Sequence, residues 1–300
     1  MPIAGGARLH AIEKTRRQKR SALSAIKTTV ADAMKERSLM MGGTGGLSEF
    51  WRSLLDWMGV VRREDPRGVV CNVCGWEGET LDSDAWHPHS VCPQCRSRVR
   101  HRLLLAAVST LDNVGTDSLV RGKRVLHFAP EPRLAAFLKQ HGSQYVTADL
   151  MGKHVDLRLD MCNMVDVADA SFDLLVACDV LEHVPDDSAA LREIHRVLAR
   201  DGWAILTVPQ KDHLPTKYED PAMVTPEQRK AAFGQEDHLR IYGDDFGRFL
   251  EAHGFAVTVV DEHSFDPKLA RRHVLFPPVL SDHPLATNHR KVYFARKRSA

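Results

Sequence analysis

Four of the six cysteines form two close pairs whose spacing is typical of a metal site. Cys71-Asn-Val-Cys74 and Cys92-Pro-Gln-Cys95 are separated by 17 residues. Two thiolates on one tight turn can share an ion, and two such turns complete a tetrahedral shell of four sulfurs. Because four thiolates close that shell, we expect a structural Zn²⁺ with no open position for catalysis.

Other interpretations of this segment remain open. A redox pair is one alternative, although a redox C-x-x-C motif usually stands alone near a βαβ unit. His87 and His89 lie between the two pairs, and either could replace a cysteine as a ligand, but surface histidines are commoner. Cys162 and Cys178 stand apart in apolar stretches, so the six cysteines do not resemble a secreted disulfide framework.

Acidic residues follow apolar segments further along the chain. Asp149 comes at the end of an expected strand, where a carboxylate can accept hydrogen bonds from both hydroxyls of a ribose. Asp160-Met161 offers a polar group and an apolar face, which together suit an adenine. Each signal is weak by itself, because an aspartate at a strand end is more often a turn residue.

Strands and helices alternate from residue 122 onward. We expect strands at 124–128, 145–148, 172–177, 203–208, 255–260 and 292–295, and helices at 97–111, 134–140, 188–199 and 249–253. This alternation predicts a mainly parallel α/β sheet with helices on both faces. Ligands of such a sheet bind at the carboxyl ends of its strands.

The segment from Phe172 to Pro209 carries the most specific pattern. A buried strand is followed by Asp179-Val-Leu-Glu-His183-Val, a helix containing E-x-x-R-V-L, a turn with Gly202, and a strand ending in Val-Pro. This pattern resembles the central part of the class I S-adenosylmethionine (SAM)-dependent methyltransferases, and the resemblance covers about residues 120–296. It implies a Rossmann-like methyltransferase sheet.

The resemblance also implies roles for individual residues. Asp149 would hold the ribose and Asp160 and Met161 would flank the adenine, with Asp179 and Leu181 near the methionine portion and the transferred methyl group. His183 would face or brace the reaction pocket as a catalytic residue. The transfer itself is an in-line displacement from a sulfonium, so it depends on positioning and on removal of a proton from the acceptor.

The first loop departs from the family pattern. The family has an acid followed by a glycine-rich turn, whereas this chain has His127 at the acid position and Ala129, Glu131 and Arg133 at the glycine positions. Cofactor contacts are expected from His127, Phe128, Ala129 and Glu131. We hypothesise that Glu131 accepts from the SAM ammonium. The cysteine pairs, the run Arg98–Arg102 and the H-F-A-P-E loop resemble a bacterial methyltransferase subgroup with an N-terminal zinc ribbon.

An insertion at about residues 210–245 is the expected substrate lid. Its hydrogen-bonding candidates are Tyr218, Gln235, His238, Arg240 and Tyr242. His238 is a candidate general base, and Arg240 could clamp a carboxylate or phosphate as a fork. The alternative is that Asp237 and Arg240 form a local helical salt bridge and His238 is a surface residue. The run Arg98–Arg102 is a second candidate anion site or, alternatively, a solvated helix face.

The remaining features concern the whole chain. Its 300 residues carry a net charge of +2, but residues 1–63 hold 12 lysines and arginines against five acids. We expect a basic, largely helical arm over 1–66, a zinc module over 67–98 and the methyltransferase domain over 99–300. Glycines 42–46 would form a flexible joint between two helices of the arm. No apolar run reaches the roughly 18 residues of a membrane span and no signal peptide is evident, so we expect a cytoplasmic protein.

Three functions compete. The leading hypothesis is methyl transfer to an oxygen or nitrogen of a small-molecule or glycan-type acceptor. The second is an RNA methyltransferase that holds nucleic acid with its zinc ribbon and basic arm. Two observations oppose it: the arm lacks interleaved aromatics, and no N-P-P-Y motif follows the strand that leads into Cys178-Asp179. A non-catalytic module that binds SAM and zinc is the third. The oligomeric state is left open, a homo-oligomer included.

Overall fold

The structure is a computed structural model, and it describes residues 68–298. The predicted helices of the arm and the glycines between them lie outside the described residues. The strands are β1 (Val69–Val70), β2 (Glu77–Gly78), β3 (Arg124–Phe128), β4 (Gln144–Asp149), β5 (Leu157–Arg158), β6 (Phe172–Cys178), β7 (Leu198–Thr207), β8 (Tyr218–Glu219), β9 (Arg240–Ile241), β10 (Phe255–Val260) and β11 (Val292–Lys297). The α-helices are α3 (Val99–Thr110), α4 (Thr116–Leu119), α5 (Pro132–His141), α6 (Asp187–Val197), α7 (Pro226–Phe233), α8 (Phe246–Ala252) and α9 (Pro267–Arg272).

Seven strands form the central sheet in the order β10-β11-β7-β6-β3-β4-β5. β3 pairs in parallel with both β4 and β6, and β6 pairs in parallel with β7. β11 is antiparallel to both of its neighbours, β7 and β10. The predicted Rossmann-like methyltransferase sheet, mainly parallel, is therefore confirmed, and the carboxyl ends of β3, β4 and β6 meet at one edge.

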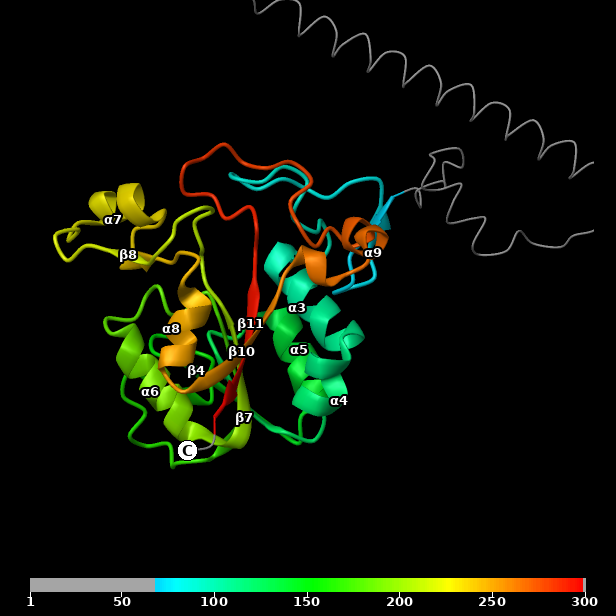
Figure 1. The fold of residues 1–300 in the computed structure, drawn as a ribbon. Coiled ribbons are helices and arrows are strands. Elements are labelled where there is room, and N and C mark those ends of the chain that lie inside the picture. Colours follow the sequence, from blue (N-terminus) through cyan, green and yellow to red (C-terminus); the bar gives the residue numbers. More distant parts are fainter. Residues whose placement is uncertain (1–67, 299–300) are drawn as a thin grey trace, which may run out of the picture. The chain divides into compact units, whose positions relative to one another are not determined.

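Helices cover both faces of the sheet, as predicted (Figure 1). Helices α3, α4 and α5 lie on one face, and helices α6 and α8 lie on the other. A separate hydrophobic cluster fills the space between the sheet and the helices on each face. Alternation along β6 supplies both clusters: Leu175 and Ala177 face α6, whereas Leu174 and Val176 face the α3 side. Burial on both faces explains why this strand is a continuous apolar run.

Most element boundaries agree with expectation to within two residues. β7 is longer than expected because it begins at Leu198, directly after α6, where the pairing with β6 is irregular between Phe172 and Leu174. The short helices α4, α7 and α9 were not predicted. Pro226 and Pro267 at the first positions of α7 and α9, together with the caps Thr225 and Asp266, are the local signals that specify two of them.

The cysteine-bearing segment packs against α3 and the turn after α9. β1 and β2 form an antiparallel hairpin, and Val70 O lies 2.9 Å from His273 Nδ1. Asn72 donates to the carbonyl of Arg102 in α3 over 2.8 Å, and Val274 joins the small apolar cluster around Cys71 and Cys92. Among the described residues, no helix is both long and apolar enough to cross a membrane.

Candidate functional site

The ends of three adjacent strands bring the predicted cofactor residues to one edge of the sheet. His127 and Phe128 end β3, Asp149 ends β4, and Asp179 directly follows β6. Ala129 and Asp179 have φ of +46° and +52°, in the left-handed region that residues with a Cβ rarely adopt. Strained backbone conformations of this kind cluster at functional sites. The N–H groups of both residues are engaged, because they donate to the carbonyls of Ala148 and Thr207 at 2.9 Å.

His127 is fully buried and neutral. Burial lowers the pKa of its imidazole to about 4. Its Nδ1 lies 2.9 Å from the hydroxyl of Tyr145, and its Nε2 is buried without a hydrogen-bond partner in the described structure. An uncharged imidazole can accept a hydrogen bond, so charge does not bar His127 from a cationic ligand.

Glu131 sits between two basic side chains of α3. Its Oε1 accepts from Arg100 Nη2 over 2.5 Å and lies 2.6 Å from His101 Nε2, while its Oε2 is buried and has no partner among residues 68–298. Although burial opposes ionisation, the contacts of His101 and Arg100 hold the pKa of Glu131 below its usual value. A carboxylate with one oxygen fixed and one oxygen open fits the hypothesised contact with an ammonium.

The run Arg98–Arg102 does not form one anion site. Arg98 pairs with Asp84 at 3.0 Å, Arg100 pairs with Glu131, and Arg102 is buried on the other side of α3. The alternative of a solvated face also fails, because only Arg98 of these three side chains is largely exposed. Residues that are two apart on a helix point in different directions, so each has its own partner.

Two arginines and a threonine from distant parts of the chain contact the carboxylate of Asp179. Arg290 Nη1 donates to Oδ1 and Oδ2 at 3.2 and 3.3 Å, Thr207 Oγ1 donates to Oδ1 at 2.8 Å, and Arg100 Nε lies 3.4 Å from Oδ2. Burial opposes ionisation, but Arg290 and Arg100 hold the pKa of Asp179 far below its usual value. Arg290 lies 111 residues away and was missed, because no local signal marks it.

Two exposed apolar side chains, those of Leu150 and Met151, directly follow Asp149. Oδ1 of Asp149 accepts from the backbone N–H groups of Met151 and Gly152 at 2.8 and 2.7 Å, which fixes the carboxylate at the strand end. A Cβ at Gly152 would lie 2.8 Å from that of Asp149, so the tight turn requires glycine. Leu150 and Met151 are 58% and 75% exposed. They were missed, although an apolar pair directly after a strand-end aspartate was a signal.

Met161 and Leu181, two other residues expected to contact the cofactor, are buried. Met161 is only 3% exposed and belongs to the core, and Asp160 Oδ1 accepts from the backbone of Cys162 at 2.8 Å. Leu181 is also buried, and its carbonyl accepts from Tyr242 and Arg240. A face for an aromatic ring is thus available at Leu150 rather than at Met161.

Glu182, His183 and His238 form a compact cluster beside Asp179. One ligand atom from each of the three lies within 4.8 Å of the others. Burial, followed by the charge of Asp179, raises the pKa of Glu182, and burial lowers the pKa of His238. The rings of His183 and His238 meet edge to face with centroids 4.8 Å apart. His238 is 2% exposed, which contradicts the alternative that it is a surface residue.

The insertion contributes structural side chains as well as exposed ones. Arg240 is 1% exposed, and its five N–H groups meet both carboxylate oxygens of Glu219 and the carbonyls of Leu181, Val184 and Pro185. Tyr242 is fully buried and donates to Asp187 at 3.0 Å. In contrast to the expectation, neither side chain has a free donor for a substrate.

Tyr218 and Gln235 remain accessible. Tyr218 is 42% exposed, with its ring 5.7 Å from that of Phe233, and Gln235 is exposed at the end of α7. Asp237 does not pair with Arg240. It lies 3.2 Å from His183 Nδ1 instead. The insertion therefore leaves Tyr218 and Gln235, two of its predicted substrate contacts, facing solvent. Its Asp237 contacts His183.

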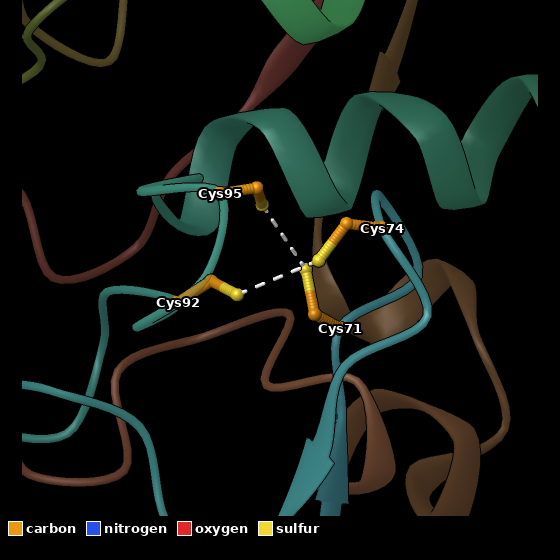
Figure 2. Close-up of side chains that lie close together, drawn as sticks. All are labelled: Cys71, Cys74, Cys92 and Cys95. Atoms are coloured by element: carbon orange, nitrogen blue, oxygen red, sulfur yellow. Dashed lines mark hydrogen bonds between the residues drawn. The ribbon is translucent and has the colours of Figure 1, made fainter.

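The four cysteines of the two pairs converge on one point (Figure 2). All four sulfurs lie within 4.8 Å of one another, and the Cys71–Cys95 and Cys74–Cys92 Sγ–Sγ distances are both 3.7 Å. Bonds of about 2.3 Å from a tetrahedral Zn²⁺ give sulfur–sulfur edges of about 3.8 Å. None of these sulfurs is in a disulfide. His87 and His89 contact Asn288 and Leu81 and lie outside the cluster.

A buried arginine lies against this cluster. Arg102 is fully buried, and its guanidinium donates to the carbonyls of Ser90, Ser97, His273 and Val274. All four acceptors are neutral. Burial lowers the pKa of Arg102 to about 10, while the charges of Cys71, Cys92 and Cys95 act in the opposite direction. A buried cation needs an anionic counterpart, and cysteine sulfurs that hold a metal ion as thiolates would supply one.

Part of the chain matches a known protein family. Residues 115–206 match the family model described as a methyltransferase domain. No curated protein matches the chain. Similar solved structures include the YcgJ protein of Bacillus subtilis, at 16% identity and a TM-score of 0.43, with 67% of this chain and 100% of that chain covered.

Two further structures have the same level of similarity. An S-adenosylmethionine-dependent methyltransferase from Mesorhizobium loti is 18% identical, with a TM-score of 0.42 and coverage of 59% of this chain and 92% of that one. The 1,6-didemethyltoxoflavin-N1-methyltransferase of Burkholderia thailandensis is 17% identical, with a TM-score of 0.42 and coverage of 67% and 83%. The family match and the sheet order together support a class I methyltransferase domain in this chain.

Proposed function

We propose that this protein transfers a methyl group from SAM to an oxygen or nitrogen of a small-molecule or glycan-type acceptor. One observation carries the proposal: within a chain whose residues 115–206 match a methyltransferase domain, Glu131, Asp149 and Asp179 lie at or just after the carboxyl ends of three adjacent strands. Open α/β sheets bind their ligands at this edge.

Three parts of SAM, namely the ribose, the adenine and the ammonium, would each meet a suitable group at that edge. Asp149 would accept from the ribose hydroxyls, and the exposed side chain of Leu150 would pack on the adenine. The open Oε2 of Glu131 would accept from the ammonium, next to the neutral His127. The left-handed backbone at Ala129 would take the place of a glycine in the turn of the usual loop, while its own N–H donates to the carbonyl of Ala148 at 2.9 Å.

Calorimetric titration with SAM and with S-adenosylhomocysteine tests the cofactor site. We expect micromolar binding that weakens at least tenfold in Asp149→Asn, which keeps the acceptor for the turn N–H groups but replaces a carboxylate oxygen with an amide. Asp166→Asn, at an exposed loop acid, is the matched control and should bind like the wild type. Absence of binding in the wild-type protein would favour a zinc-stabilised module without methyl transfer.

We also propose that Cys71, Cys74, Cys92 and Cys95 hold one structural Zn²⁺. The sulfur–sulfur distances fit a four-thiolate shell, and Arg102 provides a positive charge beside a complex whose net charge is negative. The ion would contribute folding energy to residues 68–98, which have few apolar side chains of their own. Because all four positions are filled by protein sulfur, this ion would take no direct part in catalysis.

A further inference from the structure

Two buried polar atoms in the Glu182 cluster have no hydrogen-bond partner in the described structure. They are Oε2 of Glu182 and Nε2 of His238, on side chains that are 1% and 2–3% exposed. Leaving a buried polar atom unsatisfied costs about 1–3 kcal/mol. Native proteins keep such atoms unpaired rarely, and a ligand or ion is one of the standard explanations.

The two histidines of the cluster are oriented as metal ligands are. His238 Nδ1 lies 3.2 Å from the carbonyl of Phe233, and a carbonyl can only accept, so the proton is on Nδ1 and the lone pair is on Nε2. His183 Nδ1 lies 3.2 Å from the carboxylate of Asp237 in the same way. Metal-bound histidines commonly donate their other ring N–H to a carbonyl or carboxylate.

The free nitrogens of both rings face the carboxylate of Glu182. His183 Nε2 and His238 Nε2 lie 3.9 and 4.0 Å from Glu182 Oε1. Both distances are too long for a hydrogen bond. Bonds of about 2.1 Å in a tetrahedral shell give ligand–ligand distances of about 3.4 Å, so the three side chains would draw together by about 0.5 Å around an ion.

We propose that Glu182, His183 and His238 form a second metal site, which binds a divalent first-row transition ion. Two imidazoles and one carboxylate favour such an ion, whereas Mg²⁺ and Ca²⁺ prefer all-oxygen sites and four thiolates favour Zn²⁺. Asp179 is not a ligand in this arrangement, because Arg290, Thr207 and Arg100 occupy its carboxylate.

Three protein ligands leave coordination positions open. Glu182 and His183 follow Asp179 by three and four residues in the loop after β6, at the edge where the cofactor is expected, and His238 reaches them from the insertion. The open positions would take oxygen donors of the methyl acceptor, a role that rests on the function proposed above. The two histidines would then position the acceptor as ligands rather than act as general bases.

Manganese binding tests the site without any methyl transfer. The full chain is loaded with a single equivalent of zinc and titrated with Mn²⁺, and the free ion is followed by electron paramagnetic resonance. We expect one bound Mn²⁺ per chain, with affinity at least tenfold weaker in Glu182→Gln and in His183→Ala. Both substitutions are mild, since the first is isosteric and the second affects a side chain that is 34% exposed.

Controls separate ligation from general effects on structure. His253→Ala removes a histidine whose Nδ1 lies 2.8 Å from the carbonyl of Phe249 on α8 and whose ring contacts the ring of Phe249, and it should bind Mn²⁺ like the wild type. Asp237→Ala removes the partner of His183 and should weaken binding about 10–100-fold. No stoichiometric binding in the wild type, or full binding in Glu182→Gln, would overturn the proposal.

The open positions have their own readout. A bound Mn²⁺ that keeps exchangeable water enhances the relaxation of bulk water protons, whereas an ion enclosed by protein ligands does not. We expect clear enhancement in the wild type, and its absence would exclude an acceptor at this ion. SAM affinity should change less than threefold in Glu182→Gln, so a failure of the metal site and a failure of the cofactor site give different results.

Discussion

Glu131 and Asp179 are the two carboxylates that Arg100 joins at the carboxyl edge of the sheet. Glu131 keeps one oxygen open, whereas Asp179 is fully engaged by Arg290, Thr207 and Arg100. At the scale of single residues, the availability of lone pairs and N–H groups therefore decides which groups can bind a ligand. Asp179 would serve through its fixed negative charge, and Glu131 through a direct contact.

The buried imidazole of His127 makes stability depend on pH. Its pKa is about 4 in the folded chain and about 6.5 in an unfolded chain, so the unfolded state binds more protons between these values. Stability from this group is therefore complete above pH 6.5 and is lost as the pH falls toward 4. The loss by pH 4 is on the order of 3 kcal/mol.

Urea unfolding between pH 7 and pH 4 measures this effect. Over this pH range we expect the free energy of unfolding of His127→Gln to decrease by about 3 kcal/mol less than that of the wild type. The exposed His154 provides the control, and His154→Gln should follow the wild-type curve. Parallel curves for wild type and His127→Gln would show that His127 becomes protonated without cost in the folded state.

At the scale of elements, the insertion is tied to the sheet by β9. Arg240 in β9 reaches the loop between β6 and α6 through three carbonyls, and Tyr242 reaches Asp187 at the start of α6. Lys217, before β8, also pairs with Asp187 at 2.8 Å. These contacts fix the position of His238, which lies between α7 and β9.

Removing the Arg240 guanidinium should cost stability rather than substrate affinity. Arg240→Met leaves three carbonyls and Glu219 without their donor, and we expect a loss of about 3 kcal/mol in the free energy of unfolding. Arg248→Met on α8, where the arginine is exposed, should change it by less than about 0.5 kcal/mol. If the Arg240→Met protein were stable and bound the acceptor more weakly, this result would instead support the anion clamp expected from the sequence.

At the scale of the whole described chain, α3 joins the two sites. Its first turn carries Arg100 toward Glu131 and Asp179, and Arg102 toward the cysteine cluster. The carbonyls of His273 and Val274 accept from Arg102, so the turn after α9 belongs to the same unit. A structural ion at the cysteines would therefore hold the start of α3 as well as its own loops.

Zinc removal should unfold this region and spare the sheet. After chelation we expect amide hydrogen exchange of residues 68–98 and 271–275 to accelerate by about 100-fold or more, because the shell supplies most of their cohesion. Exchange in β6 and β7 should change little. Cys162→Ser, at a cysteine outside the cluster, should retain zinc and protection, whereas equal acceleration throughout the chain would contradict a local role.

The sequence by itself determined the local features of this protein. The paired cysteines, the alternation of strands and helices and the positions of Asp149 and Asp179 at strand ends are all set by residue spacing and by the period of apolar residues. Each of these features depends on neighbours along the chain, which is why they could be predicted.

Only the tertiary structure decided which of these groups meet. Arg290 reaches Asp179 across 111 residues, His238 reaches Glu182 across the insertion, and Arg240 turns from a predicted clamp into a buried support. Burial, pairing and charge compensation arise when distant segments pack, and no local pattern records them. Within the described part of the chain, the same packing left Oε2 of Glu182 and Nε2 of His238 without partners, and the proposed metal site rests on those two atoms.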